Sequence, residues 1–169
     1  MPPWPEKQSV ELTFYTDYSL RVLMYLGVRP GKLCLISDIA RDYGISRNHL
    51  VKVVHGLARG GFIATYRGRG GGITLSRKPE EIRLGDVVRY TEGPIRPVTC
   101  FHGAELCVIT PACTLPAILS EAVENFLATL DRYTLADLLA HRRHLARLLA
   151  KGAEAPRLRN GRRAESPPR

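Results

Sequence analysis

Residues 37–75 read SDIARDYGISRNHLVKVVHGLARGGFIATYRGRGGGITL, and this stretch decides the expected fold. Ser37 is expected to cap a short helix, residues 38–43, which Gly44 ends because glycine tolerates the conformation that stops a helix. A second helix is expected after a cap at Ser46. Its apolar residues recur at helical spacing, which predicts one buried face: Leu50, Val53, Val54 and Leu57. Two helices joined by a tight turn are typical of the helix-turn-helix motif of DNA-binding proteins.

A predicted β-hairpin follows this motif. Residues 62–66 and 73–75 are expected to be strands, joined by the Gly-rich segment 67–72. Arg67 and Arg69 put positive charge at its tip, and glycines let a backbone approach phosphates closely. An ordinary hairpin turn is the alternative, but a DNA-contacting wing is favoured beside a helix-turn-helix. A nucleotide-binding phosphate loop is disfavoured because G-x-x-x-x-G-K-[ST] does not occur.

Basic residues are concentrated in the same part of the chain. The 169 residues carry a formal net charge of +9, and eight Lys or Arg against one acid, Asp42, lie between residues 41 and 78. Such a concentration of positive charge indicates that this segment binds a polyanion, here double-stranded DNA. The alternative is a basic face that is merely solvated, but scattered charge would fit that alternative better than this clustering. The expected DNA contacts lie on the second helix and the wing: Ser46, Arg47, Asn48, His49, Lys52, Arg67 and Arg69.

The chain is expected to be mainly α-helical, with a small β-hairpin in a winged helix-turn-helix domain and a long dimerisation helix. The expected first helix starts near Thr16 or Asp17, and a fourth covers residues 84–91. The long helix, from 115 or 116 to 132, has an apolar stripe that favours packing against a second copy in a homodimer, although folding back on its own core is the alternative. A last helix is expected from 134 to 150.

The predicted organisation has five parts. They are a flexible N-terminal extension (1–10), a winged helix-turn-helix DNA-binding domain (11–92), a cysteine loop (93–114), the dimerisation and C-terminal helices (115–150) and a disordered basic tail (151–169). There is no run of eighteen apolar residues, so no membrane span is expected. Residues 1–9 lack the apolar core of a signal peptide, and a cytoplasmic location is therefore expected.

The Pro- and Gly-punctuated loop contains Cys100, Cys107 and Cys113. Three thiolates within fourteen residues can converge on one metal ion or cluster, and they cannot all pair with one another in disulfides. Cys34 lies in an apolar run and is expected to be a buried small hydrophobe. A DNA-binding domain next to a thiolate-rich loop indicates a sensor.

Six segments carry a resemblance to a known family: LTFYTDYSLRVLMYL (12–26), YGISRNHLVKVV (43–54), YRGRGGGITLS (66–76), IRLGDVVR (82–89), CVITPACTL (107–115) and YTLADLL (133–139). Together they resemble the Rrf2 family of winged-helix iron–sulfur regulators, and within it the nitric-oxide-sensing repressors. The resemblance implies a homodimeric transcriptional repressor that binds a palindromic operator while it holds an iron–sulfur cluster, [4Fe–4S] in preference to [2Fe–2S].

The resemblance also implies the cluster ligands. In the family the three loop cysteines bind the cluster, and the matching positions are Cys100, Cys107 and Cys113. The nitric-oxide-sensing branch takes its fourth ligand from an aspartate near the start of the first helix of the other subunit, and Asp17 matches that position. A sister branch uses a histidine three residues after the last cysteine, where this chain has Pro116.

Several alternatives remain open from the sequence. The spacing between Cys100 and Cys107 is longer than the family leads one to expect, and it places His102 as a competing ligand. Asp17 could instead only cap the first helix. The signal could be iron, oxygen or cluster supply, or the metal could be zinc with Cys34 or His102 completing the site. An enzyme is disfavoured, because there is no nucleotide fingerprint, C-x-x-C pair or acid–base constellation.

Overall fold

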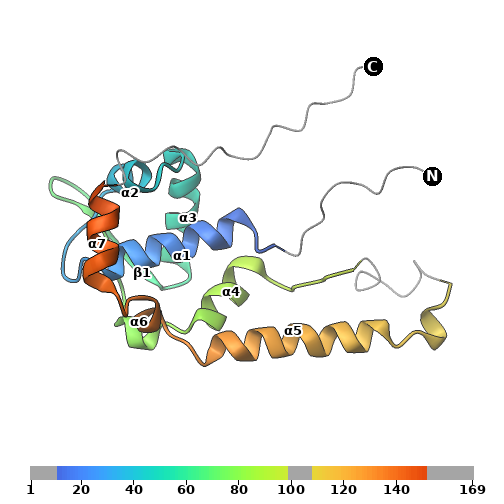
Figure 1. Ribbon diagram of the computed structural model, residues 1–169. Helices are drawn as coiled ribbons and strands as arrows, with labels where there is room; N and C mark the ends of the chain where they lie inside the picture. The colour runs from blue at the N-terminus through green and yellow to red at the C-terminus, as the bar shows by residue number, and fades with distance from the viewer. Residues whose placement is uncertain (1–10, 99–107, 152–169) are drawn as a thin grey trace, which may run out of the picture.

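A computed structural model describes residues 11–98 and 108–151, and its arrangement is shown in Figure 1. The elements in chain order are α1 (Phe14–Gly27), α2 (Ile36–Tyr43), α3 (Arg47–Arg59), β1 (Ile63–Tyr66), β2 (Gly72–Leu75), the 3-10 turn η1 (Pro79–Glu81), α4 (Leu84–Glu92), the 3-10 turn η4 (Thr110–Ala112), α5 (Leu115–Asp131), α6 (Leu135–Leu138) and α7 (Arg142–Lys151). This confirms the predicted fold class. Over the described ranges, no helix is both long and apolar enough to cross a membrane.

The first helix begins earlier than predicted. Its cap is Thr13, whose hydroxyl accepts a hydrogen bond from the backbone N–H of Thr16 at 3.3 Å. Thr13 also donates from its backbone N–H and its hydroxyl to one carboxylate oxygen of Glu92, at 2.7 and 2.9 Å. The expected start at Thr16 or Asp17 is therefore wrong, because a residue 79 positions away in the chain stabilises the earlier cap.

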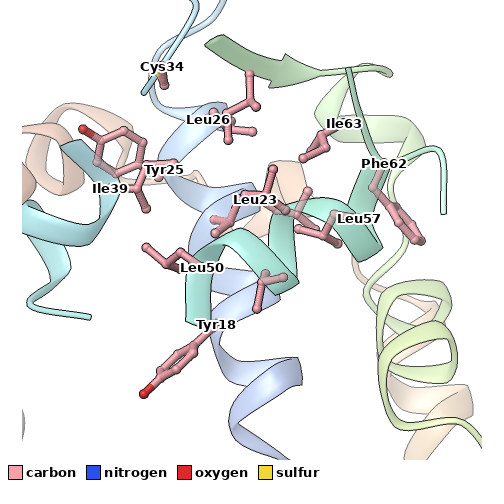
Figure 2. Packing of buried hydrophobic residues seen from close by; sticks show 14 of the residues in the cluster. Tyr18, Leu23, Tyr25, Leu26, Cys34, Ile39, Leu50, Leu57, Phe62 and Ile63 are labelled. Carbon is pink, nitrogen blue, oxygen red and sulfur yellow. The ribbon is translucent and has the colours of Figure 1, made fainter. Parts of the chain in front are cut away.

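The core lies where α1 packs against α3. Figure 2 shows Leu23 of α1 pointing toward Leu50 and Leu57 of α3. The predicted buried face of the second motif helix is confirmed in full, since its four apolar residues are at most 5% exposed: Leu50, Val53, Val54 and Leu57. Burial of each such side chain contributes roughly 1.5–3 kcal/mol, so this face fixes how α3 is oriented.

The turn of the helix-turn-helix and the cap residue of α3 are as predicted, but the cap of α2 is not. Gly44 ends α2 in the left-handed conformation, with φ of 66°. Ser37 lies inside α2, which begins at Ile36, and Leu35 occupies the cap position. Ser46 is the cap residue of α3, yet its hydroxyl makes no capping hydrogen bond within the described backbone.

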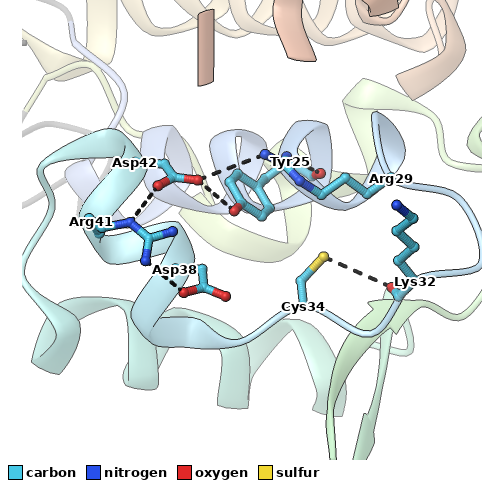
Figure 3. A network of polar contacts seen from close by, with 7 residues as sticks. All are labelled: Tyr25, Arg29, Lys32, Cys34, Asp38, Arg41 and Asp42. Atoms are coloured by element: carbon cyan, nitrogen blue, oxygen red, sulfur yellow. Dashed lines mark hydrogen bonds and ion pairs between the residues drawn. The ribbon is translucent and has the colours of Figure 1, made fainter. Parts of the chain in front are cut away.

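A buried carboxylate joins α2 to α1. Asp42 is 8% exposed in its side chain and accepts hydrogen bonds from Tyr25 at 2.7 Å and from the Nε of Arg41 at 2.9 Å, with Arg29 at 3.8 Å (Figure 3). Burial, followed by the hydrogen bond donated to Asp42, raises the pKa of Tyr25, so the phenol keeps the proton that it donates. The one acid of the basic segment therefore ties the first helix of the helix-turn-helix to α1.

The hairpin is tied to the loop before α2. Strands β1 and β2 are antiparallel, with Ile63 opposite Leu75 and Tyr66 opposite Gly72. The backbone groups of Cys34 and Ile73 exchange two hydrogen bonds of 2.9 Å each. The wing is therefore anchored to the body at its second strand, and the residues of its tip from Arg67 to Gly70 are exposed.

Among the described residues, an ion pair anchors α5 near its C-terminal end. Both guanidinium nitrogens of Arg89 donate to the carboxylate of Asp131 at 2.6 Å, and Gly85 provides the space for that carboxylate, which a Cβ atom would occupy. The structure describes α5 in full, and none of its side chains is buried. Its exposed apolar residues include Leu115, Ile118 and Phe126.

The last predicted helix is two helices. Thr134 and Asp137 form the expected capping box, but α6 ends at Leu138 and α7 begins at Arg142. The break lets Leu135 and Leu139 enter the core, where Leu139 packs against Gly27. The single helix predicted over 134–150 is therefore wrong, because burial of these leucines takes precedence over helical continuity.

Replacing Asp42 with Asn should lower the free energy of unfolding by about 2 kcal/mol, because two guanidinium groups and a phenol lose a charged acceptor. Asp38→Asn is the matched control: its pair with Arg41 is exposed, so its loss should cost about 0.5 kcal/mol or less. Urea denaturation followed by circular dichroism measures both changes. Equal losses in the two variants would contradict the structural role assigned to Asp42.

Candidate nucleic-acid interface and cluster ligands

The outer face of α3 presents the predicted contact residues to solvent. Ser46, Arg47, Asn48, His49 and Lys52 are all exposed, while the opposite face of the helix is buried against α1. His55 and Arg59 continue the exposed stripe toward the helix end. The five residues predicted at this helix are therefore all accessible, at its exposed first turn and along its outer face.

The wing adds two more cations at a tightly turned tip. Arg67 and Arg69 are exposed, and they flank Gly68, whose φ of 97° favours glycine. Gly70 also has a positive φ, of 74°. A Cβ atom at Gly71 would collide with the carbonyl oxygen of Tyr66, so this turn requires the absence of a side chain. The two arginines therefore stand on a turn whose shape is fixed by glycine.

Aromatic residues of α1 and α4 contact α3. The hydroxyl of Tyr90 donates to the carbonyl oxygen of Gly56 at 2.9 Å, and the hydroxyl of Tyr15 lies where a Cβ atom of Gly56 would be. At the other end of α3, the rings of Tyr18 and His49 stack with their centroids 6.3 Å apart. A small residue at position 56 is thus required for the close approach of α3 to α1.

Sequence reasoning missed one residue of the α3 surface. Val51 is 41% exposed and lies on the same side as Asn48 and Lys52. The signal was available, since position 51 is three residues after Asn48 and four before His55, a spacing that puts all three on one helical face.

Asp17 is presented at the surface rather than used as a cap. Its two carboxylate oxygens accept hydrogen bonds from the Nε of Arg21 at 2.9 and 3.0 Å, and its side chain is 41% exposed. Thr13 is the cap, so the interpretation of Asp17 as only the capping residue is wrong. Its carboxylate is available to a further partner.

An open apolar groove of about 450 Å³ runs beside Asp17 and Arg21. It lies between α1 and the two C-terminal helices, and its apolar lining includes Leu20, Met24, Leu138, Leu145, Leu148 and Leu149. A carboxylate–guanidinium pair at the edge of an apolar groove marks this end of α1 as a surface suited to protein contacts.

Cys113 lies between η4 and α5 as a partly exposed free thiol, whereas Cys100, Cys107 and His102 lie outside the described residues. α5 has 17 residues and so is about 25 Å long, and Cys113 is at the end opposite the Asp131 anchor. Figure 1 shows this end of α5 projecting away from α1, which carries Asp17. In the parts of the chain that the structure describes, no three His, Cys, Asp or Glu side chains gather as a metal site.

Cys34 is poorly suited to be a metal ligand. It is 6% exposed, and its thiol donates to the carbonyl oxygen of Lys32 at 3.9 Å (Figure 3). Burial raises the pKa of this thiol, and the thiolate is the form that binds metals. The burial of Cys34 therefore disfavours a zinc site in which this thiol is the fourth ligand.

The family model of Rrf2, described as an iron-dependent transcriptional regulator, matches residues 12–141. The chain belongs to the Rrf2 family. It is 50% identical over 142 residues to the HTH-type transcriptional regulator NsrR of Bacillus subtilis, an alignment that covers 83% of this chain and 97% of that protein. This Rrf2 chain is therefore a transcriptional regulator of the NsrR type.

Solved structures show the same architecture. A transcriptional regulator of Listeria innocua superposes with a TM-score of 0.66 at 29% identity, covering 80% of this chain and 90% of that one. CymR, the global cysteine regulator of B. subtilis, superposes with a TM-score of 0.61 at 28% identity, covering 79% of this chain and 98% of that one. The winged-helix fold of this Rrf2 protein is thus shared with other regulators.

Lys52→Ala and Arg69→Ala should each weaken DNA binding and reduce the slope of log affinity against log salt, by about one for each phosphate that the variant can no longer neutralise. Arg132→Ala is the control, since Arg132 is exposed beyond the end of α5 and away from α3. Fluorescence anisotropy at several salt concentrations measures the slopes. Unchanged slopes in both Lys52→Ala and Arg69→Ala would contradict the assigned surface.

Proposed function

We propose that the protein is a homodimeric transcriptional repressor that binds a palindromic operator, and that an iron–sulfur cluster sensitive to nitric oxide controls this binding. The observation that carries the proposal is the exposed basic face of α3 beside the arginine wing, in a chain 50% identical to a regulator named NsrR. Catalysis has no part in this proposal. Nitric oxide as the signal rests on the resemblance of the segments around Asp17 and Cys113 to the nitric-oxide-sensing repressors.

Two apolar surfaces that the described residues leave uncovered support a dimer. α5 exposes Leu115, Ile118 and Phe126, and a helix with an exposed apolar face is stabilised by packing against another protein surface. The groove beside Asp17 is a second apolar surface of the same chain. A dimer that buries both can place two copies of α3 about 34 Å apart, the spacing of successive major grooves on one face of DNA.

The available donors fit an iron–sulfur cluster. Cys113 is a free, partly exposed thiol, and Asp17 offers a partly exposed carboxylate that Arg21 holds by two hydrogen bonds. The proposed ligands are Cys100, Cys107 and Cys113 of one copy with Asp17 of the other. Because Cys113 lies at the projecting end of α5, donation of Asp17 by a second copy is favoured over donation within one chain. When bound, the cluster would supply iron that reacts with nitric oxide.

In this proposal the Asp17 carboxylate has two alternative partners, the Arg21 guanidinium and the cluster. In the described state both carboxylate oxygens are taken by the Arg21 guanidinium, which also lies 5.8 Å from the ring centre of Tyr43. Ligation would draw the carboxylate outward, and release would return it to Arg21. The carboxylate is the hardest donor of the proposed set and the weakest partner for iron among sulfur ligands, so its position is the one that yields first.

The alternative metal sites require different ligands. A regulator of the sister branch needs a histidine at position 116, where Pro116 lies in the first turn of α5. A zinc site needs a fourth ligand, and Cys34 is buried away from the surface. Both observations favour the nitric-oxide-sensing function with Asp17 as the fourth ligand, and His102 is the remaining competitor for that position.

Protein purified without oxygen should contain iron and sulfide, and nitric oxide should lower its affinity for its operator. Cys113→Ser should lose the iron because one thiolate is gone, whereas Cys34→Ala should retain it. Absorbance spectra, iron and sulfide analysis and anisotropy with operator DNA measure these outcomes. Colourless protein with zinc and no iron, or full iron content in Cys113→Ser, would overturn the proposal.

Asp17→Ala should shorten the lifetime of the cluster under air and change its response to nitric oxide, because one iron loses its protein ligand. Asp38→Ala is the matched control, since Asp38 is also an exposed first-turn aspartate paired with an arginine. Stopped-flow absorbance measures both rates. If the lifetime and the response of Asp17→Ala equal those of Asp38→Ala, the fourth ligand is another group.

A further inference from the structure

We infer that Val51 contacts the 5-methyl group of a thymine in the major groove and thereby selects one base in each operator half-site. This inference rests on the proposed DNA binding by α3. It adds a specificity-determining residue that carries no charge and makes no hydrogen bond through its side chain.

Burial separates Val51 from every other valine and leucine of α3. Leu50, Val53, Val54 and Leu57 are between 0% and 5% exposed, whereas Val51 is 41% exposed. The four buried residues already form the complete face that packs on the core. Val51 therefore contributes little to the described core, and its side chain is accessible to a partner on the outer face of α3.

The surroundings of Val51 are those of a DNA-facing surface. Asn48 and His55 lie one helical turn before and after it, and Lys52 lies beside it, all exposed. Figure 1 shows α3 on the other side of α1 from α5, so Val51 is not part of the apolar surface of α5. An apolar side chain among polar neighbours on this face is placed to meet a duplex rather than a second protein copy.

The chemistry of base edges selects thymine as the partner. Thymine is the only standard base with a methyl group in the major groove, and apolar side chains contact it favourably. Opposite the amino group of cytosine, valine would bury a hydrogen-bond donor without an acceptor, which is unfavourable. A β-branched side chain also has one preferred rotamer in a helix, so the two methyl groups of Val51 are held in place before DNA binds.

The test uses the full-length, anaerobically purified protein and the duplex that it enriches from a random library. Each thymine of that duplex is replaced singly by deoxyuracil, which removes only the methyl group. For the wild type, one thymine in each half-site should be sensitive, with affinity reduced about fourfold, the effect of one methyl-sized group losing its burial.

Val51→Ala supplies the second arm of a double-mutant cycle. It should bind the thymine duplex about as weakly as the wild type binds the deoxyuracil duplex, and it should no longer distinguish the two. Lys52→Ala is the matched control, because removing a phosphate-binding cation should weaken binding to both duplexes equally and leave the thymine preference intact. Circular dichroism checks that both variants are folded.

The outcomes separate this inference from the proposed function. If the protein enriches no duplex, the proposed function is wrong and the inference falls with it. If the protein binds its selected duplex but no thymine is sensitive, or if Val51→Ala distinguishes thymine from deoxyuracil as well as the wild type does, the inference alone is wrong.

Discussion

The first turn of α1 is fixed by a partly buried hydrogen bond to the end of α4, and the arrangement of the candidate site depends on it. Thr16 is fully buried, and its hydroxyl donates to the hydroxyl of Thr91 at 2.7 Å. This turn presents Asp17 outward, and α4 ends one residue after Thr91, where the segment leading to the cysteine loop begins. An unpaired buried hydroxyl is costly, so the two elements are held in one relative position.

The same turn also contacts the proposed DNA-binding helix. Tyr18 follows Asp17 directly, and its ring stacks on His49, the third residue of α3. A shift of the Asp17 turn would therefore move a side chain that touches α3 at the end proposed to contact DNA. Further along α3, the hydroxyl of Tyr90 donates a hydrogen bond to the carbonyl oxygen of Gly56. This gives the proposed cluster a short physical route to the recognition surface.

The parts of the fold with local signals could be predicted from the sequence, and those that depend on distant residues could not. The buried face of α3, the turn at Gly44 and the hairpin follow from spacing and glycine placement within short segments. The start of α1 depends on Glu92, and the break before α7 depends on Leu139 meeting Gly27. For the candidate site, charge marked Lys52 and Arg69, but a search for charge passes over an exposed valine such as Val51. Its spacing to Asn48 and His55 places Val51 on the exposed face, but only the structure shows that the other valines and leucines of α3 are buried.

The anchoring of α5 explains why a site shared between two copies suits this fold. Arg89 and Asp131 fix one end of the helix to α4, while Cys113 lies about 25 Å away at the other end. This end projects away from the folded body of its own chain, so precise geometry there is best supplied by a second protein surface. If Asp17 of a second copy supplies the fourth cluster ligand, the cluster and the DNA-binding dimer assemble in a single event. Breaking a single metal–carboxylate bond would then weaken both at once, which is the property a repressor needs in order to release its operator.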